Sequence, residues 1–307
     1  MTIVKPASAV EPPAPSVLER RYRKLLLAYP RHYRTAYGDE LLDVLLADAA
    51  GRTGPPPKEV WGLLLGGVRS RILHQATGNA WADGLHLAVT AVTAANLAAL
   101  LPYAGTLPLW TLLSALALLA VQRGRLRTAF ALTLVTGVKA AAIAAGRPAF
   151  DLTVLPVYPN PLGDRPLFGD SSPLVAAAGY AVALIGLLVL ISRSRAPRVR
   201  SWWWWAAIVP AAWAGPAWMA EEAGHPLSLS RMAAEVTAFG LAAVCGYLAR
   251  DHRWAFAASV YLLATSGGMI LHAPELTKQH LAYEGVLVLL ALAAAFAPFR
   301  HRRHCLD

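Results

Sequence analysis

Positive charge alternates along this chain in a way that limits how the chain can fold. After about residue 80, apolar segments follow one another, and Lys and Arg gather in every second connection between them. Residues 1–80 hold 11 Lys and Arg, and 12 more lie in four stretches, at 123–127, 193–200, 250–253 and 300–303. The intervening loops hold only Arg147, Arg165, Arg231 and Lys278. Cytoplasmic loops of membrane proteins retain positive charge, whereas translocated loops lose it. The pattern predicts an all-α, polytopic bundle in the cell membrane, with both termini in the cytoplasm.

Composition also favours a membrane protein over a soluble one. The chain is 56% hydrophobic and 15% charged, with a mean hydropathy of +0.44, whereas soluble chains are about 45–50% apolar and about 25% charged. The net charge of +10 lies beside apolar segments, so anionic lipid is its expected partner and direct nucleic-acid binding is not expected. Cys245 and Cys305 indicate neither a disulfide framework nor a zinc site.

We predict eight membrane spans, because a helix of about 20 apolar residues crosses the hydrocarbon core. They are expected at 81–102, 106–122, 128–146, 173–192, 202–220, 231–249, 254–273 and 281–298. Trp202 to Trp205 directly follow the basic stretch 193–200, where an aromatic belt belongs at the headgroup level. A basic cytoplasmic tail is expected at 300–307.

The largest predicted external loop, 147–172, contains five prolines, and proline disfavours a long helix there. We expect a passive connection and keep a lid or ligand contact as the alternative.

The segment before the spans has its own character. Residues 1–15 are polar and proline-rich, without an apolar core, so we expect a disordered tail and no cleavable signal peptide. Residues 16–77 predict a cytoplasmic domain of three amphipathic helices. In the second helix, the expected inward face is Tyr33, Tyr37, Leu41, Val44 and Leu45. In the third it is Val60, Leu64, Leu65, Val68 and Ile72.

Two sequence motifs in this segment resemble those of a known family of helical domains. The stretch Tyr22-Arg23-Lys24-Leu25-Leu26-Leu27-Ala28-Tyr29-Pro30 is followed by Tyr33-Arg34 and then by Tyr37-Gly38-Asp39-Glu40-Leu41-Leu42. It is similar to the permease-prefix and HAAS-type helical domains of actinobacterial membrane proteins, in which a Leu-Leu-x-x-Tyr-Pro motif leads to Tyr-Gly-(Asp/Glu)-Glu. The resemblance covers about residues 16–76. It implies a cytoplasmic module that is often encoded beside PadR-type regulators or attached to transport permeases, and it transfers no catalytic residues.

The residues of this motif have two interpretations. Tyr29, Tyr33 and Tyr37 can stack on one another, and Asp39 and Glu40 can form ion pairs with arginines of the bundle. On the first interpretation, the five residues only stabilise the domain, which we favour from spacing alone. On the second, they form a docking face for a cytoplasmic protein. The basic residues of the first helix can also lie against anionic headgroups.

Ionisable residues within the spans mark a possible polar site. Lys139 lies in the outer half of its span, and Glu235 and Glu284 lie about one turn inside the outer ends of theirs. We expect Lys139 to pair with Glu235 or Glu284. The alternatives are that the lysine extends outward to water, or that the three residues line a path for substrate or protons.

Other polar residues give weaker signals. Outer ends of the predicted spans hold Glu221, Glu222, His225, His272, Glu275 and His280. Their spacing is not that of a metal site, so no metal ligand is assigned. His86 is expected to be a hydrogen-bonded interface residue. The chain contains no P-loop, no H-E-x-x-H helix and no G-x-S-x-G elbow, so we assign no catalytic residue and no cofactor.

Three functions remain open. The first is a non-enzymatic signalling or regulatory membrane protein, whose prefix docks a regulator or a transport ATPase. The second is a permease-like transport component that uses Lys139, Glu235 and Glu284. The third is an integral membrane enzyme with an outward-facing site. We favour the first, because the chain lacks a recognisable catalytic motif and carries the prefix resemblance.

Overall fold

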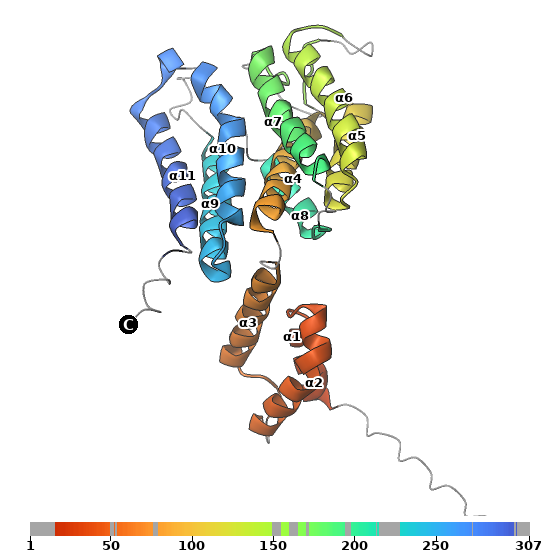
Figure 1. Cartoon of the computed structure of the whole chain (residues 1–307), viewed down its shortest axis with the longest axis vertical. Helices are drawn as coiled ribbons and strands as arrows, with labels where there is room; N and C mark the ends of the chain where they lie inside the picture. Colours follow the sequence, from red (N-terminus) through yellow and green to blue (C-terminus); the bar gives the residue numbers. More distant parts are fainter. Residues whose placement is uncertain are drawn as a thin grey trace, which may run out of the picture. The chain divides into compact units, whose positions relative to one another are not determined.

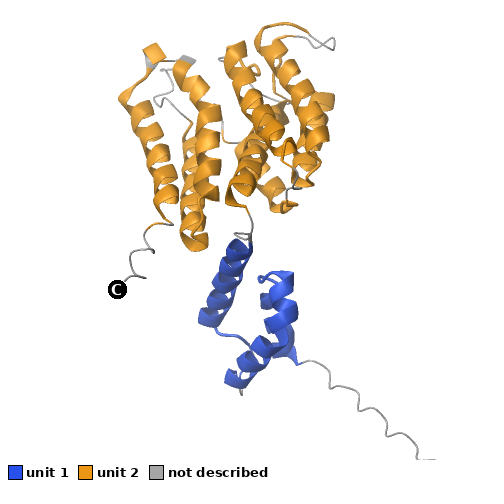
Figure 2. Cartoon of the chain, in the orientation of Figure 1, with its two compact units in different colours: residues 1–77 blue, residues 78–307 orange. Residues whose placement is uncertain are grey.

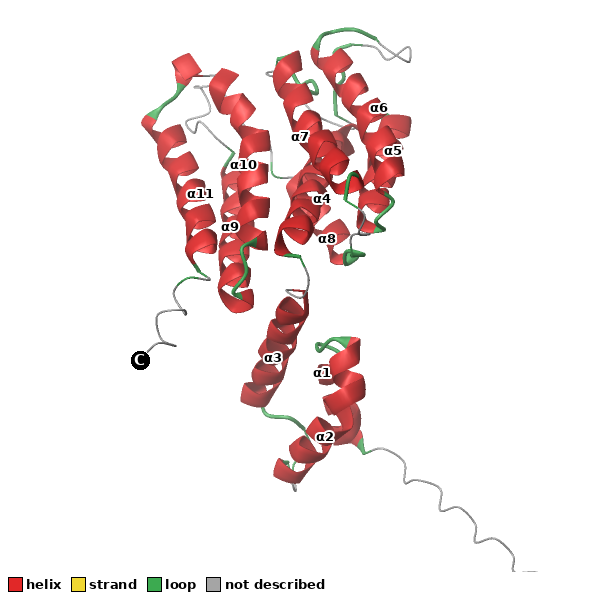
Figure 3. Cartoon of the chain, in the orientation of Figure 1, coloured by secondary structure: helices red, strands yellow, loops and turns green. Residues whose placement is uncertain are grey.

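The structure is a computed structural model that describes residues 16–49, 52, 54–75, 79–148, 155–159, 165–169, 172–193, 198–212, 214, 228–271, 273–297 and 299. Over these ranges the chain is helical and contains no β-strand (Figure 3), which confirms the predicted all-α class. The chain divides into two compact units, residues 1–77 and 78–307 (Figure 2). The predicted tails at 1–15 and 300–307 lie outside the described residues.

Unit 1 consists of α1 (Val17–Leu26), α2 (Arg31–Asp48) and α3 (Pro57–Gln75) (Figure 1). The side chain of Ser16 caps α1 by accepting a hydrogen bond from the backbone N–H of Glu19 at 3.1 Å, as N-cap serines do. The core is small: Tyr22, Leu26, Leu42, Ala49 and Leu63. Tyr22 is fully buried, and its hydroxyl donates to Glu59 Oε2 at 2.6 Å, which joins α1 to α3.

The predicted inward face of α2 is wrong in part. Leu42 is the buried residue of this helix, whereas Tyr37 and Val44 are 54% and 61% exposed. A helix turns about 100° per residue, so Leu42 lies across the helix from Tyr37 and Val44. Tyr37 and Val44 therefore face outward, whereas Leu41 and Leu45 of the predicted face pack against the core.

The predicted inward face of α3 is also wrong in part, because glycine decides which side of the helix packs. A Cβ on Gly67 would lie 2.6 Å from the Cβ of Ala28, so the backbones approach at a distance that only glycine permits. This contact turns Leu63 inward, whereas Leu65 and Val68 are 64% and 50% exposed.

Unit 2 contains the remaining helices (Figure 1). They are α4 (Ala80–Leu100, extended by a 3₁₀ turn at Leu101–Tyr103), α5 (Pro108–Gln122), α6 (Leu126–Ala144), α7 (Pro173–Ile191), α8 (Trp203–Ala212), α9 (Leu229–Ala249), α10 (Arg253–Leu271) and α11 (Lys278–Phe296), with a 3₁₀ turn at Ala273–Glu275. Helix α4 packs against α5, α7, α8 and α10, and α9 packs against α10 and α11. Figure 1 shows α4 between the α5–α7 group and the α9–α11 group.

Five helices of the described chain are long and apolar enough to cross a membrane. They are Ala80–Tyr103, Leu126–Ala144, Pro173–Ile191, Leu229–Ala249 and Lys278–Phe296, and each coincides with a predicted span. The three other predicted spans are not among these five. Helix α5 has 15 residues and α8 has 10, and α10 has 19. The number eight therefore remains a prediction.

The proline-rich loop that was predicted at 147–172 is described at residues 147–148, 155–159, 165–169 and 172. Val157 and Leu167 are buried, and the Leu167 N–H donates to the Val157 carbonyl at 2.7 Å. The Thr106 hydroxyl donates to the carbonyl of Tyr158 at 3.1 Å. These parts of the loop therefore pack against each other and against the connection between α4 and α5.

Candidate functional site

Buried charges meet at one end of unit 2, in a cluster that we call the Asp83 network (Asp83, His86, Arg200, Asp251 and Arg253). Asp83 lies in the first turn of α4, and its Oδ1 accepts from Arg200 Nη2 at 2.6 Å. Its Oδ2 accepts from Arg253 Nη1. The side chain of Arg253 is 1% exposed and that of Asp83 is 11% exposed, so water contributes little to balancing these charges.

A second carboxylate completes the charge balance. Arg253 Nε and Nη2 each lie 2.7 Å from Asp251 Oδ2, and Asp251 Oδ1 accepts from the Arg253 backbone N–H at 3.1 Å. Two arginines thus face two aspartates. Buried charges are tolerated only when they are paired and hydrogen-bonded, and this arrangement meets that condition.

Arg200 connects this network to His86. Its Nε donates to His86 Nδ1 at 3.1 Å, and His86 Nε2 lies 2.9 Å from the carbonyl oxygen of Val121. Because a carbonyl only accepts and a guanidinium only donates, Nε2 must carry the proton and the imidazole must be neutral. This confirms His86 as a hydrogen-bonded interface residue. Burial lowers the pKa of the Arg200 guanidinium, and the Asp83 carboxylate opposes that effect.

The Asp83 network brings together connections that are far apart in the sequence. The backbone N–H of Arg200 donates to the carbonyl of Gln122, the last residue of α5, at 2.9 Å. The rings of His252 and Phe299 lie 5.1 Å apart. Arg200 and residues 250–253 therefore lie at the same end of unit 2 as the start of α4, the end of α5 and Phe299.

The second polar cluster lies among α9, α10 and α11 and centres on Glu235. Its Oε1 accepts from Arg231 Nε and from the Tyr261 hydroxyl, both at 3.0 Å, and its Oε2 accepts from the Tyr283 hydroxyl at 2.5 Å. Three donors therefore hold the carboxylate of Glu235. The next acid, Glu284, follows Tyr283 and is half-buried, and no hydrogen bond to it is found within the described chain.

The structure places Lys139 apart from the two glutamates. Lys139 lies on α6, which packs against α5 and α7, and it is 1% exposed. Its Nζ lies 5.4 Å from the centre of the Trp110 ring on α5, a cation–π distance. The predicted pairing of Lys139 with Glu235 or Glu284 is not what the structure shows. The acidic residues belong to a different group of helices.

In unit 1 the rings of the three tyrosines of the motif pack together as predicted, with Tyr29 and Tyr33 stacked and Tyr37 tilted against Tyr33. The ring centres of Tyr29 and Tyr33 are 5.0 Å apart, and those of Tyr33 and Tyr37 are 5.2 Å apart. By helix geometry, Glu40 and Val44 lie on the Tyr37 side of α2, whereas Asp39 lies on another side. Asp39 and Glu40 are both exposed, and no ion pair reaches either residue within the described residues. The proposed docking face thus gains Val44 and loses Asp39.

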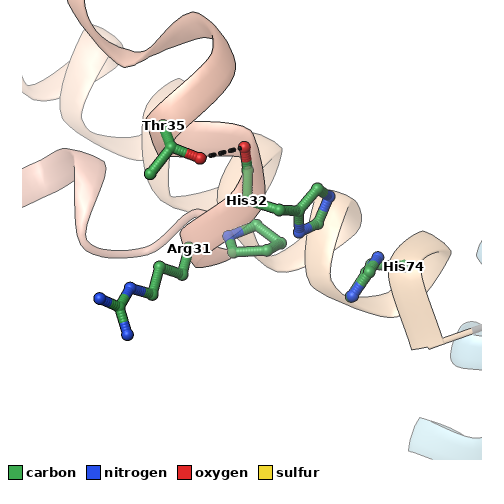
Figure 4. Close-up of a pocket in the computed structure, with 5 residues that line it drawn as sticks. Arg31, His32, Thr35 and His74 are labelled. Atoms are coloured by element: carbon green, nitrogen blue, oxygen red, sulfur yellow. Dashed lines mark hydrogen bonds between the residues drawn. The ribbon is translucent and has the colours of Figure 1, made fainter.

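An open pocket on unit 1 lies beside the start of α2 (Figure 4). Pro30, Arg31, His32, Thr35 and His74 line it. The rings of His32 and His74 are 3.9 Å apart, and the Thr35 hydroxyl donates to the His32 carbonyl at 2.9 Å. In Figure 4 the Arg31 side chain points away from the two imidazoles. Sequence reasoning missed this pair, because α2 and α3 are separated by a turn whose geometry the pattern does not encode.

The candidate metal ligands at the outer ends cannot be assembled into a site. The side chains of Glu221, Glu222, His225, His272 and Glu275 lie outside the described residues. His280 is buried and caps α11, since its Nδ1 lies 2.9 Å from the Thr277 hydroxyl. Among the residues that can be described, no three His, Cys, Asp or Glu side chains are grouped as metal ligands.

Comparison of the chain with protein-family models, with curated proteins and with solved structures finds no match. Its function must therefore be argued from its own residues.

Proposed function

We propose that the chain is a multi-pass protein of the cell membrane with eight spans and both termini in the cytoplasm. Five helices that could cross a bilayer support this, together with the convergence of basic connections at one end of unit 2. Large apolar side chains such as Ile185 and Leu289 are 62% and 65% exposed on these helices, and lipid would cover them. At the basic end, the Trp205 indole donates to Gln122 Oε1 at 2.9 Å.

Labelling with a membrane-impermeant maleimide tests this topology. Cys245 and Cys305 are first replaced by Ser, and single cysteines are introduced as Tyr158→Cys and Arg123→Cys, at two exposed positions. The label should reach Tyr158→Cys in intact cells, but Arg123→Cys only after the membrane is permeabilised. The reverse pattern would contradict the proposed orientation.

We further propose that the protein is non-enzymatic and regulatory, and that unit 1 docks a cytoplasmic protein, either a regulator or a transport ATPase. The observation that carries this is the stripe on α2 in which Tyr37, Glu40 and Val44 are exposed and Tyr33 is half-buried. Aromatic residues are enriched in protein interfaces, and Glu40 has no ion pair within the described chain to neutralise it. The resemblance to permease-prefix domains supports the same role.

Site-specific photocrosslinking in cells tests the docking face. A photoreactive phenylalanine at Tyr37 should give a discrete crosslinked product. The same residue at Asp39, which is exposed on another side of α2, should give little or none. In the Glu40→Lys variant the Tyr37 product should decrease while the amount of protein in the membrane stays constant. Equal crosslinking from both positions would reject a specific face.

A transport role is the second candidate, favoured by Glu284. This half-buried acid lies beside the saturated Glu235 cluster, and no hydrogen bond within the described chain satisfies it. Proteoliposomes with a trapped pH dye test the role. Glu284→Gln and Lys139→Ala should each reduce proton flux without lowering the amount of folded protein, if the residues serve transport. Loss of folded protein, or unchanged flux, would indicate a structural role.

A further inference from the structure

The outer face of α3 carries apolar side chains that the described residues of unit 1 leave exposed. Trp61, Leu65 and Val68 are 65%, 64% and 50% exposed. Their spacing of four and three residues places all three on one face of the helix. Leu63, which is 8% exposed, points to the opposite face, where α3 contacts α1. The stripe is therefore an unpartnered surface of a helix that is packed on its other side.

Basic residues flank this stripe. Lys58 and Arg69 are exposed, and helix geometry places both beside Leu65. No ion pair to either residue is found within the described chain. Tryptophan, aliphatic and basic side chains on one helix face are the combination found in helices that lie in the interface of a bilayer.

The connection from α3 to α4 is short. Gln75 ends α3 and Ala80 begins α4, so their Cα atoms can be at most about 18 Å apart. The inference rests on the proposed function, in which α4 crosses the bilayer. Because the connection is short, the end of α3 must then lie within reach of the headgroup layer.

We propose that the face formed by Trp61, Leu65, Val68, Lys58 and Arg69 docks on the anionic headgroup layer of the bilayer that α4 crosses. Charge complementarity favours anionic lipid over a protein partner as the occupant of this face. The exposed stripe on α2 carries the acidic Glu40, which anionic lipid repels, whereas the stripe on α3 carries two uncompensated cations. The two outward faces of unit 1 thus suit two different partners.

Fluorescence quenching in the full-length protein tests this docking. With Cys245 and Cys305 replaced by Ser, an environment-sensitive fluorophore is attached at Leu65→Cys, and the protein is reconstituted in vesicles that contain phosphatidylglycerol. Brominated lipid should quench the label, and aqueous acrylamide should quench it much less than a label at Asp39→Cys. A label at Leu65→Cys that acrylamide reaches as freely as the control overturns the proposal.

Charge removal tests the electrostatic half of the docking. Each basic residue near an anionic surface strengthens binding by about fivefold. Replacing both Lys58 and Arg69 by Gln should therefore lower the ratio of docked to undocked protein by roughly 25-fold. The matched control removes the same charge from α1, which packs on the opposite side of α3, as Arg20→Gln with Lys24→Gln. An effect of the control pair as large as that of the α3 pair overturns the assignment to α3.

Two further outcomes separate this proposal from others. Protection of Leu65→Cys from acrylamide without quenching by brominated lipid would show that protein covers the face, and would overturn docking on lipid. A label at Ile185→Cys, on an exposed side of α7, reports on the spans themselves. If that label is quenched by brominated lipid and Leu65→Cys is not, the docking fails alone. If neither is quenched, the proposed membrane topology fails with it.

Discussion

The two units of this protein use the same chemistry, an arginine beside a carboxylate, in two different environments. In unit 1, Arg23 and Glu19 lie 2.9 Å apart, with side chains 60% and 19% exposed. In unit 2, Arg253 contacts Asp83 with side chains 1% and 11% exposed. Water screens the first pair, so it contributes little to stability. The second pair cannot be broken without leaving a charge in a dry interior. Burial therefore determines how much an arginine–carboxylate contact contributes to the free energy of unfolding.

The largest effect is expected for Arg253→Met. The substitution keeps much of the side-chain volume but leaves Asp83 and Asp251 with less positive charge to balance them. Removing one partner of a buried ion pair costs about 3–5 kcal/mol, and the free energy of unfolding in detergent micelles should fall by that amount. Arg123→Met is the matched control, because Arg123 is exposed in the turn after α5. Equal stability of the two variants would show that the network is not buried as described.

A smaller effect is expected for Glu235→Gln. The amide retains an acceptor for one tyrosine, but loses the negative charge that Arg231 contacts. Hydrogen bonds to a charged group contribute about 1.5–3 kcal/mol, so a loss of about 2 kcal/mol should appear in the same unfolding measurement. Glu284→Gln should change the free energy of unfolding far less. A larger loss for Glu284→Gln than for Glu235→Gln would reverse the roles given to the two acids.

Tyr22→Phe is expected to have a still smaller effect, confined to unit 1. It removes the hydrogen bond to the Glu59 carboxylate, which is partly exposed and also pairs with Arg52. Its contribution is therefore about 1.5 kcal/mol, the low end for a bond to a charged group. Hydrogen–deuterium exchange of the intact protein should quicken in peptides from α1 and α3, while peptides from α4 to α11 keep their rates. Faster exchange in both units would mean that they do not unfold separately.

Tyr22 also predicts a pH dependence in unit 1. Burial, followed by the hydrogen bond to Glu59, raises the pKa of its hydroxyl to about 12. Because the raised pKa favours the neutral phenol in the folded state, its contribution is complete below pH 10 and is lost between about pH 10 and 12. The tyrosinate absorbance of the wild type minus that of Tyr22→Phe should rise near pH 12. A midpoint near pH 10 would place Tyr22 in water.

The smallest effect is expected for Arg23→Ala. This exposed i,i+4 pair contributes about 0.3–0.5 kcal/mol, and added salt should reduce even that. Exchange rates in unit 1 at high salt should not distinguish the variant from the wild type. A loss as large as that of Arg253→Met would remove the distinction between the two units.

Much of the fold follows from apolar spacing, because length and hydropathy are local properties. They predict the all-helical class, which is confirmed, and eight spans, of which five coincide with helices that are long and apolar enough to cross a membrane. The inward faces of α2 and α3 were predicted less well. Apolar periodicity identifies a stripe such as Leu65 and Val68, but does not say whether protein or another surface covers it. The packing side of α3 is set by Gly67, whose close contact with Ala28 depends on a tertiary arrangement.

The polar sites were predicted in part. His86 and the tyrosine stack follow from their positions, and Lys139 was recognised as a buried cation, but Trp110 was not predicted as its neighbour. The ion pairs of Asp83 were missed. The signal was available, because Asp83 is the acidic residue inside the predicted span 81–102. Its partners could not be identified, since Arg200 and Arg253 resemble every other arginine at the basic ends of the spans.

The sequence separations within the Asp83 network have a consequence for how the protein is made. Arg200 follows Asp83 by 117 residues and Arg253 follows it by 170. At about 5–20 residues per second, the ribosome needs roughly 10 to 30 s to supply the second arginine after the aspartate. Until residue 200 is made, Asp83 stands at the start of α4 without either arginine. A chain that stops between residues 200 and 253 leaves Asp83 with one of its two arginine partners.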